Sequence, residues 1–202
     1  MATPHPHIAF EGPIAAGKTT LATLLAKHLE ADLLLEEFEG NEFLGDFYAD
    51  QERWALPMQL WFLSARFRPL GNIIPSFSRP IVADYTNRKD SLFARLLLKS
   101  RELRLFNQLA ATMAGGPPPN LIVYLDASND VLLERIQRRG RPYENAIDSH
   151  YLDALRQAYD VDLLGKAGIN MLRFDTSQLD LQSEFQMNEL YHAITSRAYL
   201  AL

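Results

Sequence analysis

Gly12-Pro-Ile-Ala-Ala-Gly17-Lys18-Thr19 is the stretch of this 202-residue chain that decides its fold, because it fits the pattern G-x-x-x-x-G-K-[ST] without departure. The run His7-Ile-Ala-Phe10 before it has the apolar character of a strand, and leucines recur after it at helical spacing. A turn between a strand and a helix presents backbone N–H groups to an anionic phosphate at the positive end of the helix dipole. The motif therefore predicts a site for a nucleoside triphosphate.

Individual residues of this loop have expected roles. Lys18 is expected to reach the β- and γ-phosphates, and the Thr19 hydroxyl to ligate Mg²⁺. Ala15 stands where glycine is common in such loops, so its backbone is expected to avoid the left-handed region. The predicted phosphate-binding set is Gly12, Pro13, Ile14, Ala15, Ala16, Gly17, Lys18, Thr19 and Thr20.

Short apolar runs alternate with helical patterns along the rest of the chain. The pattern predicts strands at 7–10, 33–36, 80–84, 121–126 and 170–174. It predicts helices at 17–30, 51–70, 129–139, 149–166 and 184–199, with a kink at Pro57 and a loop at 115–120. Strands separated by helices indicate an α/β fold whose parallel sheet is covered by helices on both faces. We expect one domain over residues 1–202, with a flexible tail at 1–6.

Composition narrows the classes of function. The chain is 48% hydrophobic and 22% charged, as a soluble globular domain is, and it has no cysteine for disulfides, thiolate metal sites or thiol nucleophiles. A net charge of -5 argues against a protein that binds nucleic acid. The histidines lack metal-ligand spacing, and no run is long enough for a membrane span or shaped like a signal peptide. A cytoplasmic location without membrane or nucleic-acid partners is expected.

Two short patterns imitate a GTP-dependent switch. Asp162-Leu-Leu-Gly165 has the letters D-x-x-G but lies inside a helical pattern. Asn87-Arg-Lys-Asp90 has the composition of the guanine-reading N-K-x-D in the wrong order. Both are interpreted as coincidence, and a regulatory P-loop NTPase stays open as the alternative from a different class.

An arginine-rich segment favours a phosphotransferase. Arg135, Arg138 and Arg139 occupy positions i, i+3 and i+4, so one face of a predicted helix carries three guanidinium groups. A glycine then ends the helix, and Arg141 begins a polar loop. Guanidinium groups that cover transferring phosphates stabilise the charge that spreads in the transition state. Residues 135–145 are therefore predicted to form a lid, with Arg135 and Arg139 catalytic and Arg139 and Arg141 binding phosphates; a solvated basic face is the alternative.

Further motifs, taken together in their order and spacing, resemble the deoxyribonucleoside kinase family. Besides the phosphate loop, they are residues 36–44 (EEFEGNEFL), Phe47-Tyr48, Glu52-Arg-Trp54, Gln59-Leu-Trp-Phe-Leu63, Arg66-Phe67 and 135–141 (RIQRRGR). The resemblance covers the chain from about residue 7 to residue 175. Residues 81–85 (IVADY), Lys89, Phe93-Ala94 and 139–144 (RGRPYE) look most like the bacterial deoxyguanosine kinase branch.

This resemblance implies an ATP- and Mg²⁺-dependent kinase that phosphorylates the 5′-hydroxyl of a purine deoxyribonucleoside, with deoxyguanosine as the expected acceptor. Deoxyadenosine or a broader acceptor range is the alternative. A nucleoside monophosphate kinase would need further cations for the acceptor phosphate, and residues 36–66 supply few. The resemblance also implies a homodimer.

Two carboxylates are candidates for the catalytic base. Glu36 ends a predicted strand beside the phosphate loop, where it is expected to orient the acceptor hydroxyl and take its proton. Asp84 closes another strand at the same sheet edge, so it is a second candidate base or a ligand to Mg²⁺ through water. Many members of the family have arginine after that acid, whereas Tyr85 stands here, and Lys89 or Arg66 is expected to supply the missing cation.

A further set of side chains is expected to bind the nucleoside. Gln59 lies on an apolar helix face, and a purine edge presents a donor–acceptor pair that matches its amide, although a core glutamine bonded to backbone stays open. Phe93 is a candidate to stack on the base or a core residue. By resemblance, Tyr48 and Glu144 hold the sugar 3′-hydroxyl, and Arg66 lies close to the base and the catalytic carboxylate.

Overall fold

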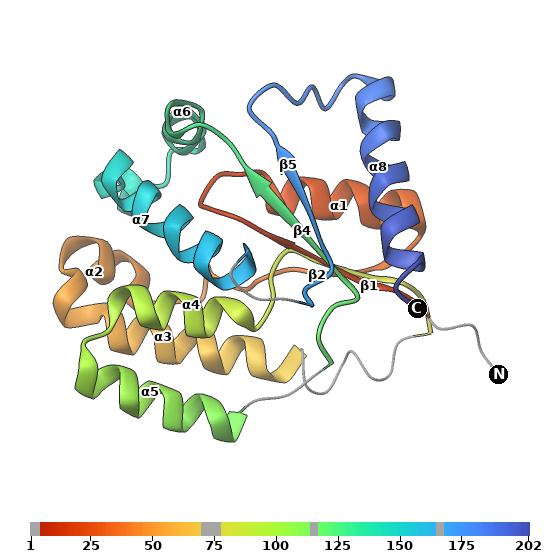
Figure 1. Ribbon diagram of the computed structural model, residues 1–202. Coiled ribbons are helices and arrows are strands. Elements are labelled where there is room, and N and C mark those ends of the chain that lie inside the picture. Colours follow the sequence, from red (N-terminus) through yellow and green to blue (C-terminus); the bar gives the residue numbers. More distant parts are fainter. Residues whose placement is uncertain (1–4, 70–77, 114–116, 165–167) are drawn as a thin grey trace.

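A parallel sheet of five strands forms the centre of the computed structural model, which describes residues 5–69, 78–113, 117–164 and 168–202 (Figure 1). The strands are arranged in the order β2-β3-β1-β4-β5, and every neighbouring pair is parallel. Their bounds are β1 (His7–Glu11), β2 (Asp32–Leu34), β3 (Ile81–Ala83), β4 (Leu121–Asp126) and β5 (Met171–Asp175). The predicted α/β fold with a parallel sheet is confirmed.

The helices between these strands include both predicted and unpredicted elements. They are α1 (Lys18–Leu29), α2 (Phe43–Ala49), α3 (Gln51–Arg68), α4 (Arg88–Leu97), α5 (Ser100–Met113), α6 (Asn129–Arg139), α7 (Ser149–Tyr159) and α8 (Glu184–Tyr199). A 3-10 helix, η3 (Pro142–Ala146), follows α6, and a π-helix, η4 (Asp160–Leu164), continues α7. The predicted kink at Pro57 falls inside α3, which continues through it.

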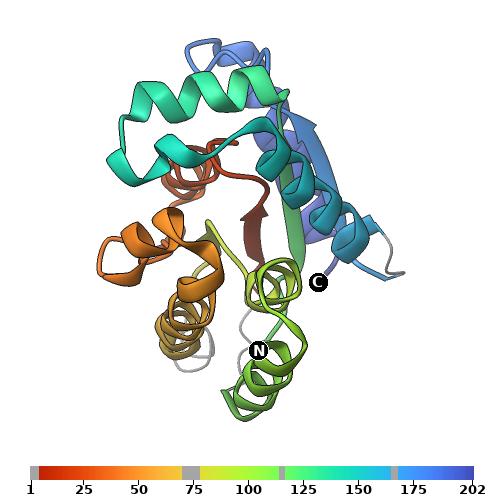
Figure 2. The same ribbon diagram turned by 90° about the vertical axis from the view of Figure 1, so that its left-hand side faces the viewer.

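Helices cover both faces of the sheet (Figures 1 and 2). Leu121, Val123 and Leu125 of β4 belong to the hydrophobic core that the sheet shares with α1 and α8. The alternate residues Ile122 and Tyr124 pack instead against α4 and α7. Helix α3 packs on α4 and α5 to build a further layer on this second side. The central strands β1, β3 and β4 are therefore buried on both faces, as parallel strands usually are, whereas the edge strands β2 and β5 are partly exposed.

Most predicted elements are present, with shifted ends. The predicted strand at 121–126 and the helices at 129–139 and 184–199 coincide with β4, α6 and α8. The strand predicted at 33–36 is wrong at its end, because β2 stops at Leu34 and the Glu36 N–H binds the Asp84 carboxylate instead of a strand (2.7 Å). Residues 70, 115–116 and 165–166 of predicted segments lie outside the described residues.

The predicted flexible tail is only partly within the described chain. Residues 1–4 lie outside it. Pro6 does not fit a flexible tail, since it is buried and its carbonyl oxygen accepts a hydrogen bond from the Ile81 N–H (3.0 Å). This bond extends the pairing of β1 with β3. Among the described residues, no helix combines the length and the apolar character that crossing a bilayer requires.

The turn after β1 passes very close to β4. Gly12 has a φ of 143°, and a Cβ atom placed there would lie 2.1 Å from the carbonyl oxygen of Leu125. Neither the φ angle nor the backbone oxygen can adjust easily. The phosphate loop therefore begins where only glycine allows β1 and β4 to approach.

We predict that Gly12→Ala lowers the free energy of unfolding by about 3 kcal/mol, since backbone strain and overpacking add. For a chain of this size that corresponds to a fall of roughly 10 °C in Tm, measurable by thermal denaturation. Gly45→Ala is the matched control, because Gly45 lies in α2 with nothing within 4 Å of the added Cβ, and it should be neutral or stabilising. Equal melting temperatures for Gly12→Ala and the wild type would contradict the close approach.

Candidate functional site

The phosphate loop folds around the side chain of Lys18, the first residue of α1. The Lys18 Nζ donates to the carbonyl oxygens of Gly12 (2.8 Å) and Pro13 (2.7 Å), so the ammonium group lies over the loop. Burial and the neighbouring charge of Lys89 lower the pKa of Lys18 to about 8. The loop thus brings a cation and the start of a helix to one point, as a triphosphate requires.

The conformation of Ala15 differs from the expectation. Its φ is 63°, so the prediction that this residue avoids the left-handed region is wrong. That region costs a residue with a Cβ roughly 1–2 kcal/mol, which the surroundings must offset. Two hydrogen bonds from neighbouring side chains hold the loop backbone in this conformation. The carbonyl oxygen of Ala15 accepts from Arg135 (3.4 Å), and that of Ala16 accepts from the Thr176 hydroxyl (3.1 Å).

Asp84, just past the end of β3, connects the Glu36 backbone to α1. Its Oδ1 accepts from the Glu36 N–H (2.7 Å), and its Oδ2 accepts from the Thr19 hydroxyl (2.5 Å). The cation expected to replace arginine at Tyr85 does not pair with Asp84, because both Lys89 and Arg66 bind Glu36. Neutral donors hold Asp84, and Tyr85 is buried.

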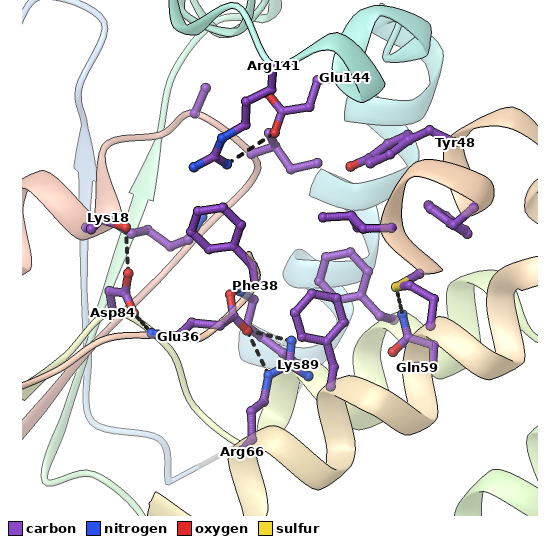
Figure 3. A pocket seen from close by; sticks show the side chains of 18 of the residues that line it. Lys18, Glu36, Phe38, Tyr48, Gln59, Arg66, Asp84, Lys89, Arg141 and Glu144 are labelled. Carbon is purple, nitrogen blue, oxygen red and sulfur yellow. Dashed lines mark hydrogen bonds and ion pairs between the residues drawn. The ribbon is translucent and has the colours of Figure 1, made fainter. Parts of the chain in front are cut away.

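Glu36 is held by two cations from different helices (Figure 3). Its Oε1 accepts from Arg66 of α3 (2.7 Å from Nε), and its Oε2 from Lys89 of α4 (2.5 Å). Burial alone would raise the pKa of Glu36, but the charges of Lys89 and Arg66 outweigh it and lower that pKa to about 2. Arg66 also donates to Asp90, so one guanidinium joins two carboxylates.

A cavity lies between α2, α3, α4 and the η3 region, with Glu36 at one side (Figure 3). Apolar side chains, among them Phe38, Phe47, Met58, Phe62 and Phe93, form most of its wall. An apolar wall with a few polar groups suits a small organic molecule such as a nucleoside. We call it the acceptor cavity.

Gln59 is a buried polar group of the acceptor cavity whose amide is not fully hydrogen-bonded. Its Nε2 contacts only the Met58 sulfur (3.5 Å), and its Oε1 is buried without a hydrogen-bond partner among the described residues. Buried amides are normally bonded, so this one is suited to a ligand's donor and acceptor. The alternative of a core glutamine satisfied by backbone does not fit this geometry.

The segment after α6 closes one side of the acceptor cavity. Glu144 of η3 is buried and accepts two charge-assisted bonds from Arg139 (2.7 Å from Nη2 to Oε1, 3.0 Å from Nε to Oε2). Tyr48 of α2 stacks on Tyr143 with ring centroids 5.9 Å apart. Burial, with the nearby Tyr151 and Glu144, raises the pKa of Tyr48 well above its ordinary value, so it remains a neutral hydrogen-bonding phenol.

Arg141 lies on a different side from the one predicted. It was expected to bind the phosphates of the donor, but it lines the acceptor cavity, and its guanidinium covers the Phe38 ring at 4.0 Å from the centroid. The reason is the turn after Gly140, whose φ of 68° ends α6 and directs the chain toward α2.

A second cavity lies over the phosphate loop. It is lined by residues 15–21 of the loop and α1, by Arg135, Arg138 and Arg139 of α6, and by Thr176, Leu179 and Leu181 after β5. All three arginines line this one cavity, as their spacing on one helix face predicts, but their guanidinium groups are held apart by different partners. Arg135 binds Thr176 (2.7 Å to the carbonyl oxygen), Arg138 is mostly exposed beside Glu134, and Arg139 binds Glu144.

The two cavities meet at the phosphate loop. Ala15, Lys18, Thr19 and Arg139 line both of them. A molecule in the second cavity can therefore present its terminal phosphate to a molecule in the acceptor cavity, beside Lys18.

The residues at this junction fit ATP and Mg²⁺. The loop supplies N–H groups and an ammonium for a triphosphate, and the Thr19 hydroxyl and Asp84 carboxylate are hard oxygen ligands 2.5 Å apart. In the described ranges no cluster of three or more histidine, cysteine or carboxylate side chains can hold a metal alone. Mg²⁺ commonly needs only one or two protein ligands beside phosphate oxygens and water, and when bound it neutralises phosphate charge.

Sequence reasoning missed three residues of this region. Glu11, at the end of β1, is fully buried and bonded to Thr86 and Tyr159. Asp90 pairs with Arg66, and Thr176 holds Arg135. A glutamate directly before the phosphate loop is a signal that could have indicated Glu11, whereas the partners of Asp90 and Thr176 are distant in sequence.

Comparisons with known proteins agree with this geometry. The family model described as deoxynucleoside kinase matches residues 8–196. Deoxyguanosine kinase of Bacillus subtilis (strain 168) is 37% identical over 160 residues, 77% of this chain and 77% of that protein. Deoxyadenosine kinase of Dictyostelium discoideum is 38% identical over 162 residues, 76% of this chain and 64% of that protein. The structure of deoxyadenosine kinase from M. mycoides with bound dATP has a TM-score of 0.80 at 22% identity, and the match covers 95% of this chain and 100% of that one.

We predict that Lys18→Ala leaves the fold intact while turnover of a nucleoside triphosphate falls by about 10²-fold or more. The Lys18 ammonium makes its hydrogen bonds to loop carbonyls, so its removal deletes phosphate binding and little packing. Circular dichroism and steady-state kinetics measure the two effects. A folded variant that keeps more than about a tenth of the wild-type kcat would show that this loop does not act on the phosphates.

Proposed function

Because the chain belongs to the deoxynucleoside kinase family, whose members are phosphotransferases, we propose that it transfers the γ-phosphoryl group of ATP to the 5′-hydroxyl of a purine deoxyribonucleoside, with deoxyguanosine preferred. One observation carries the proposal: a phosphate cradle and an apolar cavity with an unpaired amide meet at Lys18, Thr19 and Arg139. The nucleoside would occupy the acceptor cavity, and the triphosphate would lie over the loop.

Recognition of the base rests on Gln59, and the preference for a purine rests on the relatives. Its free Oε1 can accept from a base N–H while its Nε2 donates to a neighbouring base acceptor, an alternation that a purine edge offers. Phe93 and Phe62 line the same cavity and supply faces for a flat ring. The name of the Bacillus subtilis relative favours deoxyguanosine. Deoxyadenosine is the second candidate, favoured by the Dictyostelium relative.

In the proposed reaction the 5′-oxygen attacks the γ-phosphorus, the bond from that phosphorus to the β,γ-bridging oxygen breaks, and ADP leaves. The hydroxyl proton passes to Glu36. A carboxylate whose pKa is about 2 is a weak base, so its main role is to orient the hydroxyl and to take the proton late in a loose transition state. Arg66 and Lys89 keep it ionised and fixed.

The test is a coupled assay with ATP across the four deoxynucleosides and their ribose counterparts. We expect deoxyguanosine to give the largest kcat/KM, and deoxyadenosine to follow. Gln59→Leu should lower the purine kcat/KM by about tenfold or more, since a buried base edge then lacks its partners. ATP hydrolysis at a rate that no deoxynucleoside changes would refute the proposed acceptor class and favour a regulatory NTPase. A preference for pyrimidine nucleosides would refute the purine assignment.

We predict that Glu36→Gln lowers kcat by about 10²-fold or more, with little change in the KM for the nucleoside, because shape is kept and charge is lost. The exposed neighbour Glu37→Gln is the matched control and should behave as the wild type. Asp84→Asn should also lower the rate and make it more dependent on Mg²⁺ concentration. Near-normal turnover by Glu36→Gln would move the base role to Asp84.

We predict strong selection for the sugar 3′-hydroxyl by Tyr48 and Glu144. A site built to bond a hydroxyl rejects the analogue without it, so a 2′,3′-dideoxynucleoside should lose about 10²-fold or more in kcat/KM. Tyr48→Phe and Glu144→Ala should each reduce that preference, and their double mutant should be non-additive, because both would share one ligand atom. Equal use of both substrates by the wild type would remove these residues from sugar recognition.

We also propose that two copies associate and that the enzyme acts in the cytoplasm. The homodimer rests on the resemblance, and Leu105 and Leu109 of α5, 46% and 38% exposed one turn apart, offer an apolar face for it. Analytical ultracentrifugation of the wild type and Leu105→Glu tests it, with a monomeric wild type as the contrary result.

A further inference from the structure

We propose that Glu11, which takes no part in the chemistry above, is a positioning residue that fixes the start of α4, and with it Lys89 on Glu36, to the phosphate loop. The inference deepens the proposed function and rests on it, because it concerns the alignment of the same donor and acceptor sides.

The Glu11 carboxylate is completely buried and makes three hydrogen bonds. Its Oε1 accepts from the N–H (2.9 Å) and the hydroxyl (2.6 Å) of Thr86. Its Oε2 accepts from the hydroxyl of Tyr159 at the end of α7 (2.9 Å). One side chain on the central strand therefore holds the turn after β3 and one of the helices that cover this face.

Next to the acceptor cavity, Thr86 connects the Glu11 carboxylate to α4. Its hydroxyl accepts from the N–H of Arg88, the first residue of α4 (3.1 Å). Asn87 at the N-cap makes no side-chain capping bond, so Thr86 supplies the cap. Lys89 is the next residue, and its Nζ reaches Glu36 at 2.5 Å.

On the donor side, Glu11 directly precedes Gly12. The Gly12 carbonyl oxygen accepts from Lys18, and the Gly12 backbone is locked against Leu125. Two rigid attachments thus meet at Glu11: the backbone of the phosphate loop and, through Thr86, the backbone of α4. A displacement of about 1 Å between such groups can cost about 10²-fold in rate.

The negative charge of Glu11 is costly for the fold alone. All three hydrogen-bond donors are neutral, and burying a carboxylate without a tight ion pair is unfavourable. Burial raises the pKa of Glu11, and the charge of Lys89, the Thr86 bond and the charge of Lys18 oppose that rise. A neutral glutamine here would accept weaker hydrogen bonds from Thr86 and would not attract Lys89 and Lys18, so the negative charge strengthens the attachment of α4.

The first experiment compares Glu11→Gln with the wild type at saturating ATP and the best deoxynucleoside. We expect kcat per folded enzyme to fall at least about tenfold with nearly unchanged nucleoside KM and no loss of Tm. Asp126→Asn is the matched control, since Asp126 is a mostly buried carboxylate at the end of β4 that binds Arg156 and Arg173. It should lose stability and keep kcat.

The second experiment tests the route through α4. In a Lys89→Met background, Glu11→Gln should cause little further loss, because the proposed effect of Glu11 acts through the Lys89–Glu36 pair, which Lys89→Met already removes. Thr86→Val should lower kcat, whereas Thr86→Ser, which keeps the hydroxyl, should retain it. Hydrogen exchange at the Arg88 amide should be faster in Glu11→Gln than in the wild type.

Unchanged kcat in Glu11→Gln, or fully independent effects of Glu11→Gln and Lys89→Met, would overturn the inference. If Glu11→Gln does not fold, Thr86→Val decides, and normal turnover by that variant overturns the proposal. A wild type inactive on every deoxynucleoside would refute the proposed function instead, and the Arg88 exchange rate would still decide whether Glu11 fixes α4.

Discussion

Three carboxylates converge on one edge of the sheet because β1, β2 and β3 are parallel neighbours and end together. Glu11, Glu36 and Asp84 stand at or just beyond these ends. Negative charges gathered away from water repel strongly and lose hydration, so the edge is stable only with cations and donors directed at it. Lys18 from the loop and Lys89 from α4 meet this need. This charge balance adds to the hydrophobic packing that holds α1 and α4 on the sheet.

The three carboxylates at this edge of the sheet have different environments. Glu36 is held by two cations, and its pKa is lowered to about 2. Glu11 is surrounded by neutral donors and its pKa is raised by burial. Acids whose environments separate their pKa values usually have separate roles. Glu36 is suited to remain ionised at a reacting hydroxyl, and Glu11 to remain in place behind it, while Asp84 links the Thr19 hydroxyl to the Glu36 backbone.

Local chemistry made much of the fold predictable: the phosphate motif specifies a strand, a turn and a helix, and β4 is an uninterrupted apolar run. Helices α2, α4 and α5 were missed, although Leu103, Phe106 and Ala110 of α5 recur at helical spacing. The φ of Ala15 and the separation of the three arginines were not predictable, because they depend on Thr176 and Glu144, whose approach is set by the tertiary structure. The site residues expected from the sequence mostly surround the two cavities, and Arg141 lies on the other side from its prediction.

In the proposed reaction, Arg66 would link recognition of the acceptor to catalysis. It lines the acceptor cavity, binds Glu36 with one edge of its guanidinium and Asp90 with another. A rigid planar group with two carboxylates cannot shift toward one without altering the other. A base that does not fit beside Arg66 would therefore bind less tightly and would also displace Glu36. In such a site, a base that fits poorly would lower the rate of phosphoryl transfer as well as the affinity for the nucleoside.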